Sequence, residues 1–147
     1  MANTNVYFDA SRFNLKCRRI QKIVATVGQR VIMEGAQDIY NNTDKKLSGP
    51  HYGYPPNYPE GGGQRGKIPI PRLTGTLARS LQMRPLSTLT WAVYADDRIA
   101  KHAKFVHDGT KKMRPRRFLT DTFAERSPAI VNNMRYKLIT AINKDGL

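Results

Sequence analysis

The chain has 147 residues, 39% of them hydrophobic, and its 25 Lys and Arg outweigh 11 Asp and Glu to give a net charge of +14. This length predicts one domain, residues 1–147, with its own core. The charge predicts a polyanionic partner, either nucleic acid, an anionic membrane or an acidic protein surface. No apolar run approaches the roughly 18 residues that span a bilayer, so we expect no role in a membrane.

The first predicted element is a long helix over residues 12–40, preceded by an N-terminal arm at residues 1–11 that lacks the features of a signal peptide. Asp9 or Ser11 is expected to cap the helix, and Asn41-Asn42 to end it. Cations crowd its first turns, where they oppose the helix dipole, and two interpretations stay open: a role for them outside the monomer, or a solvated basic face. Its apolar residues recur at three- and four-residue spacing, at Ile20, Ile23, Val24, Val27, Val31 and Ala36.

A long loop at residues 45–71 follows, rich in proline and glycine. Gly61, Gly66 and Lys67 match part of a phosphate-binding loop, but Ile68 stands where Ser or Thr is needed and no strand precedes the motif, so we reject nucleotide binding. Amphipathic side chains suited to an interface lie in the loop, so we expect it to dock as an arm on a neighbouring subunit. The predicted anchors are Tyr52, Tyr54 and Tyr58.

The rest of the chain predicts a short helix over residues 75–80 capped by Thr74, and two strands over 81–86 and 89–95 around Ser87-Thr88. A short buried segment, 99–106, then leads into a turn at His107–Thr110. A last helix covers 118–143, in which Pro128 is expected either to introduce a kink or to start a second helix after Ser127. This order indicates an α+β fold, with a small antiparallel or mixed sheet packed against the two main helices.

The two helical stripes and the alternating strand predict the core. We expect five apolar side chains from the strand, the following segment and the last helix to pack against Ile20, Val24 and Val27 of the first helix. These five are Trp91, Val93, Phe105, Phe118 and Leu119.

Nothing in the sequence indicates an enzyme, a metal site or a cofactor. His102 and His107 are five residues apart, which suits neither a helical nor a strand face, and no cysteine lies near them. His107-Asp108 alone is not a catalytic triad. The single cysteine, Cys17, is expected to be an inert helix thiol.

The strongest chemical signal is a basic run in the stretch from Phe105 to Leu119. Residues 98–117 carry eight Lys and Arg against one Asp. No known base-reading motif accompanies them, so they favour attraction to a nucleic-acid backbone over sequence-specific binding. The candidate interface residues are Lys111, Lys112, Arg114, Arg116 and Arg117.

Three motifs in this order resemble the head–tail joining and tail-completion proteins of tailed bacteriophages. They are Leu73-Thr74-Gly75-Thr76-Leu77 followed by Arg79-Ser80-Leu81, then Ala103–Thr110 with its turn at Gly109 and Thr110, then Met113–Leu119 at the start of the last helix. Two positions depart from the family pattern. His107 stands where the family usually has an acid, and Arg117 replaces a proline.

The resemblance implies a structural virion protein of the neck or tail top, assembled in the host cytoplasm. Such subunits form a homo-oligomeric ring, commonly a hexamer, that completes or terminates the tail tube and joins it to the head connector or stopper protein. Double-stranded DNA passes through the ring without sequence-specific contacts, so the basic run is expected to face this DNA or an acidic neighbouring ring. The alternative is a basic nucleic-acid-binding module without sequence specificity.

Overall fold

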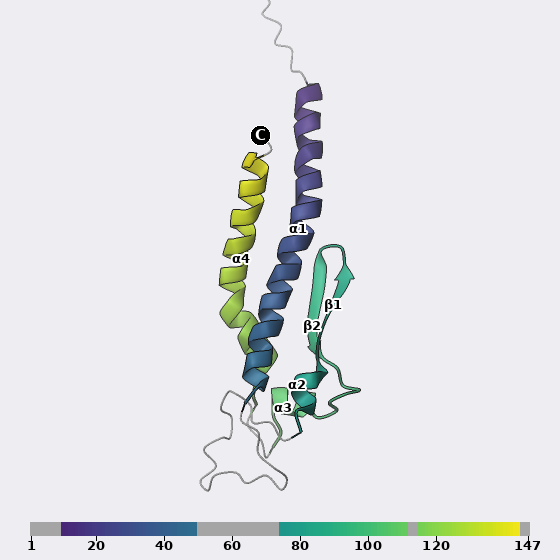
Figure 1. The fold of residues 1–147 in the computed structure, drawn as a ribbon, viewed down its shortest axis with the longest axis vertical. Coiled ribbons are helices and arrows are strands. Elements are labelled where there is room, and N and C mark those ends of the chain that lie inside the picture. The colour runs from purple at the N-terminus through teal and green to yellow at the C-terminus, as the bar shows by residue number, and fades with distance from the viewer. Residues whose placement is uncertain (1–9, 50–73, 112–114, 145–147) are drawn as a thin grey trace, which may run out of the picture.

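The computed structural model describes residues 10–49, 74–111 and 115–144. Its elements are α1 (Ala10–Leu47), α2 (Thr76–Ser80), β1 (Leu81–Ser87), β2 (Thr90–Ala95), α3 (Ala103–Asp108) and α4 (Phe118–Lys144). The fold is α+β, as the sequence predicts, and its sheet is a single antiparallel pair (Figure 1).

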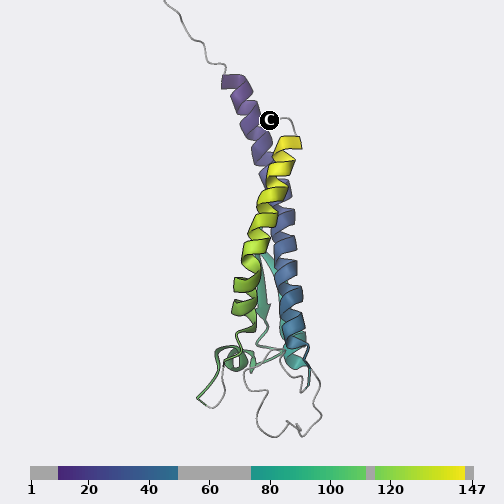
Figure 2. The same cartoon turned by 90° about the vertical axis from the view of Figure 1, so that its left-hand side faces the viewer.

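The two long helices form the body of the molecule. α1 and α4 lie side by side and antiparallel in both views (Figures 1 and 2), and the β1–β2 hairpin packs on a different flank of α1. The short helices α2 and α3 lie at the end of the molecule where α1 finishes and α4 begins, called the lower end below. The opposite end, built from the start of α1 and the finish of α4, is the upper end.

α1 is longer than its sequence pattern indicates. The expected end at Asn41-Asn42 is wrong, because the helix continues to Leu47. Asn42 does not break it, since its side-chain amide donates back to the carbonyl oxygen of Asp38 at 2.8 Å. Beyond it, Thr43 and Leu47 are almost fully buried, and this packing outweighs the weak helix propensity of two asparagines. Lys45 and Lys46 in the last turn also suit the helix dipole.

The hairpin lies close to its predicted position. Its register pairs Leu81 with Ala95 and Pro85 with Trp91, and the turn falls at Thr88-Leu89, one residue later than expected. Before it, Gly75 rather than Thr74 is the N-cap of α2, with a φ of 71° that favours glycine. The Thr74 hydroxyl still lies 3.4 Å from the backbone nitrogen of Thr76.

The main core cluster lies at the lower end, and Ile23, Val31 and Ala36 of the predicted α1 stripe are also buried. Leu47, Leu81 and Phe118 form its centre, and Val93 and Leu119 pack against it half-buried. The predicted pairing with Ile20, Val24 and Val27 is therefore wrong, because the antiparallel start of α4 meets the last turns of α1. Val24 is itself 39% exposed, and Trp91 is half-buried beside the α1–α4 pair.

Phe105 is not a core residue, although the sequence suggests it. Its side chain is 57% exposed, whereas Ala100 and Ala103 are buried. Residues 103–108 form the single short helix α3, and its phase turns Ala103 and Val106 inward and Phe105 outward. Ile99, expected in the same buried segment, is also exposed.

α4 is one helix through Pro128, so a second helix does not start after Ser127. The residues that form its apolar stripe are only partly covered. Leu119, Ile130, Met134 and Leu138 are half-buried, whereas Phe123 is 59% exposed.

α1 and α4 approach each other closely at Gly35. A Cβ atom added there would lie 2.8 Å from Ile130 Cγ2 and 3.0 Å from Met134 Cε. Ile130 is β-branched and stiff at this carbon, so it cannot move aside cheaply. Glycine therefore sets the distance between the two helices at this point.

Phe118→Ala should reduce the free energy of unfolding by about 3–5 kcal/mol, because it empties the centre of the core. Phe105→Ala is the matched control and should change it by less than about 0.5 kcal/mol. Urea denaturation followed by circular dichroism measures both. Equal losses would show that the lower-end core is assigned wrongly.

Gly35→Ala should destabilise the protein by about 1–3 kcal/mol, since its methyl group meets Ile130. Gly28→Ala in the same helix places its Cβ at an ordinary 3.5 Å from Leu89 Cδ2, so it should be neutral or stabilise by up to about 1 kcal/mol. Thermal unfolding of the two variants tests this pair. A stabilised Gly35→Ala protein would contradict the close contact.

Candidate polyanion interface

The structure describes three of the five residues of the predicted basic run, Lys111, Arg116 and Arg117. Lys112 and Arg114 lie outside the described residues, and Lys111 and Arg117 are exposed. Arg116 is half-buried. Its backbone N–H donates to the carbonyl of Val106 at 3.0 Å, and its own carbonyl accepts from the N–H of Phe118 at 2.7 Å. Arg116 therefore ties the segment before α4 to α3.

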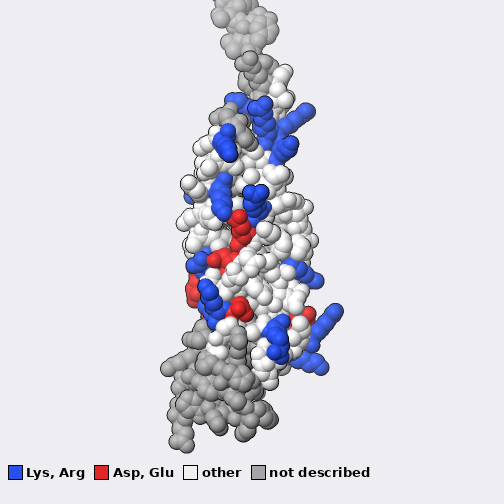
Figure 3. Space-filling model, viewed as in Figure 1, with Lys and Arg blue, Asp and Glu red and all other residues white. Residues whose placement is uncertain are grey.

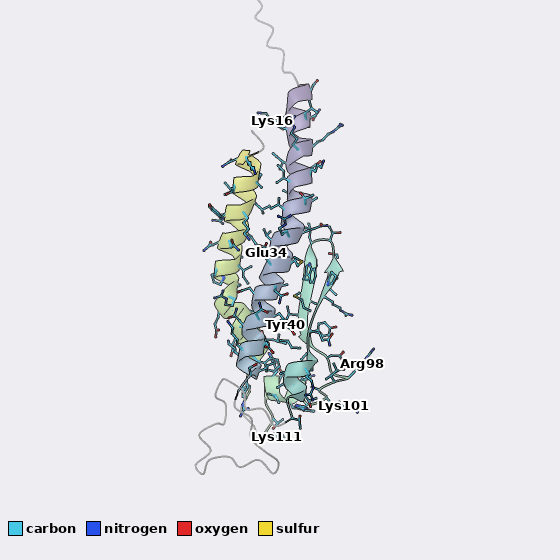
Figure 4. The ribbon with its side chains drawn as sticks, in the orientation of Figure 1. Lys16, Glu34, Tyr40, Arg98, Lys101 and Lys111 are labelled. Carbon is cyan, nitrogen blue, oxygen red and sulfur yellow. The ribbon has the colours of Figure 1, made fainter. Side chains whose placement is uncertain are left out.

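Further exposed cations surround this segment at the lower end. Figure 4 places Arg98, Lys101 and Lys111 together there, and Lys104 of α3 is also exposed. The exposed carboxylates of Asp97 and Asp108 lie in the same part of the chain. The lower end therefore carries both signs of charge, which weakens its attraction for a polyanion.

The turn residues of the second motif have structural roles. Gly109 has a φ of 79°, and its N–H donates to the carbonyl of Phe105 at 2.9 Å, which ends α3; Thr110, beside it, is exposed. The ring of His107 meets the edge of buried Phe118 at 5.1 Å between centroids. Its Nδ1 lies 2.7 Å from Asp108, and this hydrogen bond lowers the pKa of that carboxyl.

The upper end differs, because it carries cations and very few acids. From Ala10 to Met33 the first helix contains no Asp or Glu, and from Arg126 to Lys144 the last helix contains none. Figure 3 shows the resulting concentration of Lys and Arg over this end, and Lys16 is labelled there in Figure 4. The exposed cations are Lys16, Arg18, Arg19, Lys22, Arg30, Arg135 and Lys144.

The antiparallel pairing brings the two acid-free stretches together. Gly35 faces Met134, and Lys144 lies ten residues beyond Met134 just as Ala25 lies ten before Gly35. The last turn of α4 therefore lies within about one helical turn of Lys22 along the helix pair, in agreement with Figures 1 and 2. Arg135 and Lys144 are the residues that sequence reasoning missed. The signal available was the absence of acids from both stretches, which becomes one surface only once the helices are paired.

The acids in the middle of the molecule are already paired. Glu34 binds Lys137, Asp38 binds Arg126 through both carboxylate oxygens at 2.8 and 3.0 Å, and Glu125 binds Lys46 at 2.7 Å. The hydrogen bonds from Arg126 lower the pKa of Asp38. These pairs join α1 to α4, and among the described residues they leave the cations of the upper end without acidic neighbours.

Other predicted sites find no further support in the part of the chain described. Tyr52, Tyr54 and Tyr58 lie outside it, as does His51. Among the described residues no group of three His, Cys, Asp or Glu is placed to hold a metal ion. Their helices include none long and apolar enough to span a bilayer. Comparisons with family models, curated proteins and solved structures give no match.

Asp38→Asn should lower the free energy of unfolding at pH 7 by up to about 1 kcal/mol, because both partners are partly exposed. Since the folded-state pKa of Asp38 is below its unfolded value, its contribution is complete above the ordinary aspartate pKa near 4 and is lost as the pH falls through the lower folded value. Urea titrations of both proteins should therefore differ at pH 7 and converge by about pH 2.

Asp97→Asn, at an exposed turn, is the control and should follow the wild type throughout. A difference between Asp38→Asn and wild type that persists unchanged into acid would mean that charge is not its cause.

Proposed function

We propose that this protein is a structural subunit of a ring at the head–tail junction of a tailed bacteriophage, where it completes or terminates the tail tube and joins it to the head connector. Double-stranded DNA passes through the ring and is held by its backbone only. The observation that carries the DNA contact is the basic upper end, where exposed cations of α1 and α4 gather with almost no acid between them. Such a surface attracts phosphates of any sequence.

The resemblance to head–tail joining proteins gains support from where its motif residues lie. Ser80 is fully buried and donates to the carbonyl of Leu77 at 2.7 Å, and Leu81 and Phe118 belong to the core centre. Gly75 and Gly109 are the positive-φ residues of the described chain. The three motifs thus meet in one packed unit at the lower end, as expected if they preserve a common fold.

A ring subunit also needs surface for its neighbours. Large apolar side chains of both helices and of the hairpin are exposed, among them Leu86, Leu89, Phe123, Val131 and Ile139. Contacts between ring subunits would bury such side chains. The alternative, a basic nucleic-acid-binding module that acts as a monomer, accounts for the charge but not for this apolar surface.

Two measurements distinguish these functions. If the protein is a ring subunit, sedimentation and negative-stain electron microscopy should show closed oligomers with a central hole. If it is a monomeric nucleic-acid-binding module, they should show monomers. Phage particles that lack the protein should accumulate as separate heads and tails. Normal, joined particles in its absence would exclude the head–tail function.

The DNA contact is tested by removing charge at each end. Arg18→Ala/Arg19→Ala/Lys22→Ala at the upper end should flatten the salt dependence of binding to a random-sequence duplex by about 2–3 units of log K per log salt, close to 0.9 per lost contact. Arg98→Ala/Lys101→Ala/Lys104→Ala at the lower end is the matched control and should change it by less than about 1. Fluorescence anisotropy at several salt concentrations gives both slopes. A larger effect of the control would place the DNA at the lower end.

A further inference from the structure

A groove with a volume of about 570 Å³ runs between the α1–α4 pair and β2. Its floor comes from α1 at Ile32, Ala36 and Ile39, and one wall comes from the apolar stripe of α4. The other wall is β2, at Trp91, Ala92 and Val93, whereas no residue of β1 lines it. β2 is therefore the strand of the hairpin nearer to the groove.

The free edge of β2 belongs to this wall. In an antiparallel pair, directly bonded and non-bonded residue pairs alternate. The N–H of Asp96 donates to the carbonyl of Ser80 at 2.7 Å, so this is a bonded pair, and the register makes Ala95, Val93 and Trp91 members of non-bonded pairs. Pro85, which has no N–H, falls opposite Trp91, as this alternation requires.

It follows that the backbone N–H and C=O groups of Trp91, Val93 and Ala95 point away from β1. No backbone hydrogen bond outside the hairpin engages these three residues within the described ranges. An edge with three successive unused donor–acceptor positions beside an apolar groove is a site for an added strand. Among the described residues that line the groove, the polar side chains are the neutral Thr120 and Ser127, which disfavours a charged small molecule.

We propose that residues 67–73 of a second copy of this chain add to the free edge of β2 as a third, antiparallel strand. The sequence there is Lys-Ile-Pro-Ile-Pro-Arg-Leu. Ile68, Ile70 and Arg72 keep their N–H groups and alternate with Pro69 and Pro71, which have none. If the N–H groups of Ile68, Ile70 and Arg72 face β2, both prolines face outward, where no donor is needed.

The register follows when the three residues of the added strand that have N–H groups pair with the three residues of β2 whose backbone groups point away from β1. Ile68 lies opposite Ala95, Ile70 opposite Val93 and Arg72 opposite Trp91. Directly opposite residues share one face of a sheet, so Ile70 enters the groove beside Val93, and the aliphatic stem of Arg72 lies along Trp91. Ile68 lies on the same face beside Ala95, next to the groove. The same register puts Lys67 opposite Asp96, beside Asp97, where the charges are complementary.

The strand comes from another copy because the same chain cannot reach this position. Thr74 contacts Thr76 at the start of α2, at the end of the hairpin where β2 finishes (Figure 1). In the antiparallel register residue 72 lies opposite Trp91, roughly 13 Å away along β2. Two residues of chain span at most about 7 Å. The proposal therefore rests on the oligomer of the proposed function and names the contact that builds it.

Disulfide trapping between two single-cysteine chains, both carrying Cys17→Ser, tests the contact directly. Ile70→Cys mixed with Val93→Cys should form linked dimers at least about tenfold faster than Ile70→Cys mixed with Tyr94→Cys, because pairing raises the effective concentration of the matched thiols. Tyr94 is the neighbouring residue, on the opposite face of β2, where Arg84 stacks over its ring at 5.1 Å. Equal rates would overturn the proposal, as would a chain with cysteines at both 70 and 93 that bridges only within itself.

A second pair of variants separates this contact from the ring itself. Ile68→Asp/Ile70→Asp should abolish oligomers in sedimentation while circular dichroism stays unchanged, whereas Pro55→Asp/Pro56→Asp, in the same loop, should leave them intact. Oligomers that survive Ile68→Asp/Ile70→Asp would refute the strand but not the ring. A wild-type protein that stays monomeric and is not needed for joining would refute the proposed function as well.

Discussion

The antiparallel contact of α1 and α4 determines where the other parts of this molecule lie. Gly35 lets Ile130 and Met134 approach closely, and three ion pairs along the helices fix their register. That register brings the two acid-free stretches to the same end and leaves the core at the other. In this register only part of the apolar stripe of α4 contacts α1. Because the hairpin packs on another flank of α1, the rest of the stripe forms one wall of the groove.

The same contact carries an electrostatic cost at the upper end. Cations on two neighbouring helices repel one another, and those in the first turns of α1 also oppose its dipole. Salt screens this repulsion over about 8 Å, and a bound polyanion would remove more of it. The ion pairs of Asp38 and Glu34 lie nearer the middle and do not offset it. The repulsion destabilises the free subunit and is relieved when phosphate groups bind. This behaviour suits a surface that faces DNA.

Periodicity identified the helices and the hairpin, but it failed where tertiary packing decides. The Asn41-Asn42 pair is a good local stop signal, yet burial of Leu47 extends α1 past it. Phe105 is apolar, yet the phase of a six-residue helix turns it outward. The basic upper end was only half visible in the sequence, because Lys144 joins it through the pairing of α4 with α1 and not through proximity along the chain. The groove was invisible for the same reason, since three separate elements line it.

A two-stranded sheet is marginal unless it packs on other elements or gains strands. Here β1 and β2 rest on α1, and no described residue pairs with the edge of β2 beside the groove. If each copy donates one strand and receives one, the contact is heterologous, and its repetition gives a closed ring when the rotation between copies returns to the start. Pro69 and Pro71 remove the two central N–H donors from the outer edge of the donated strand, which disfavours the addition of a further strand. Growth then stops at one added strand per subunit, and only in a closed ring is every groove filled.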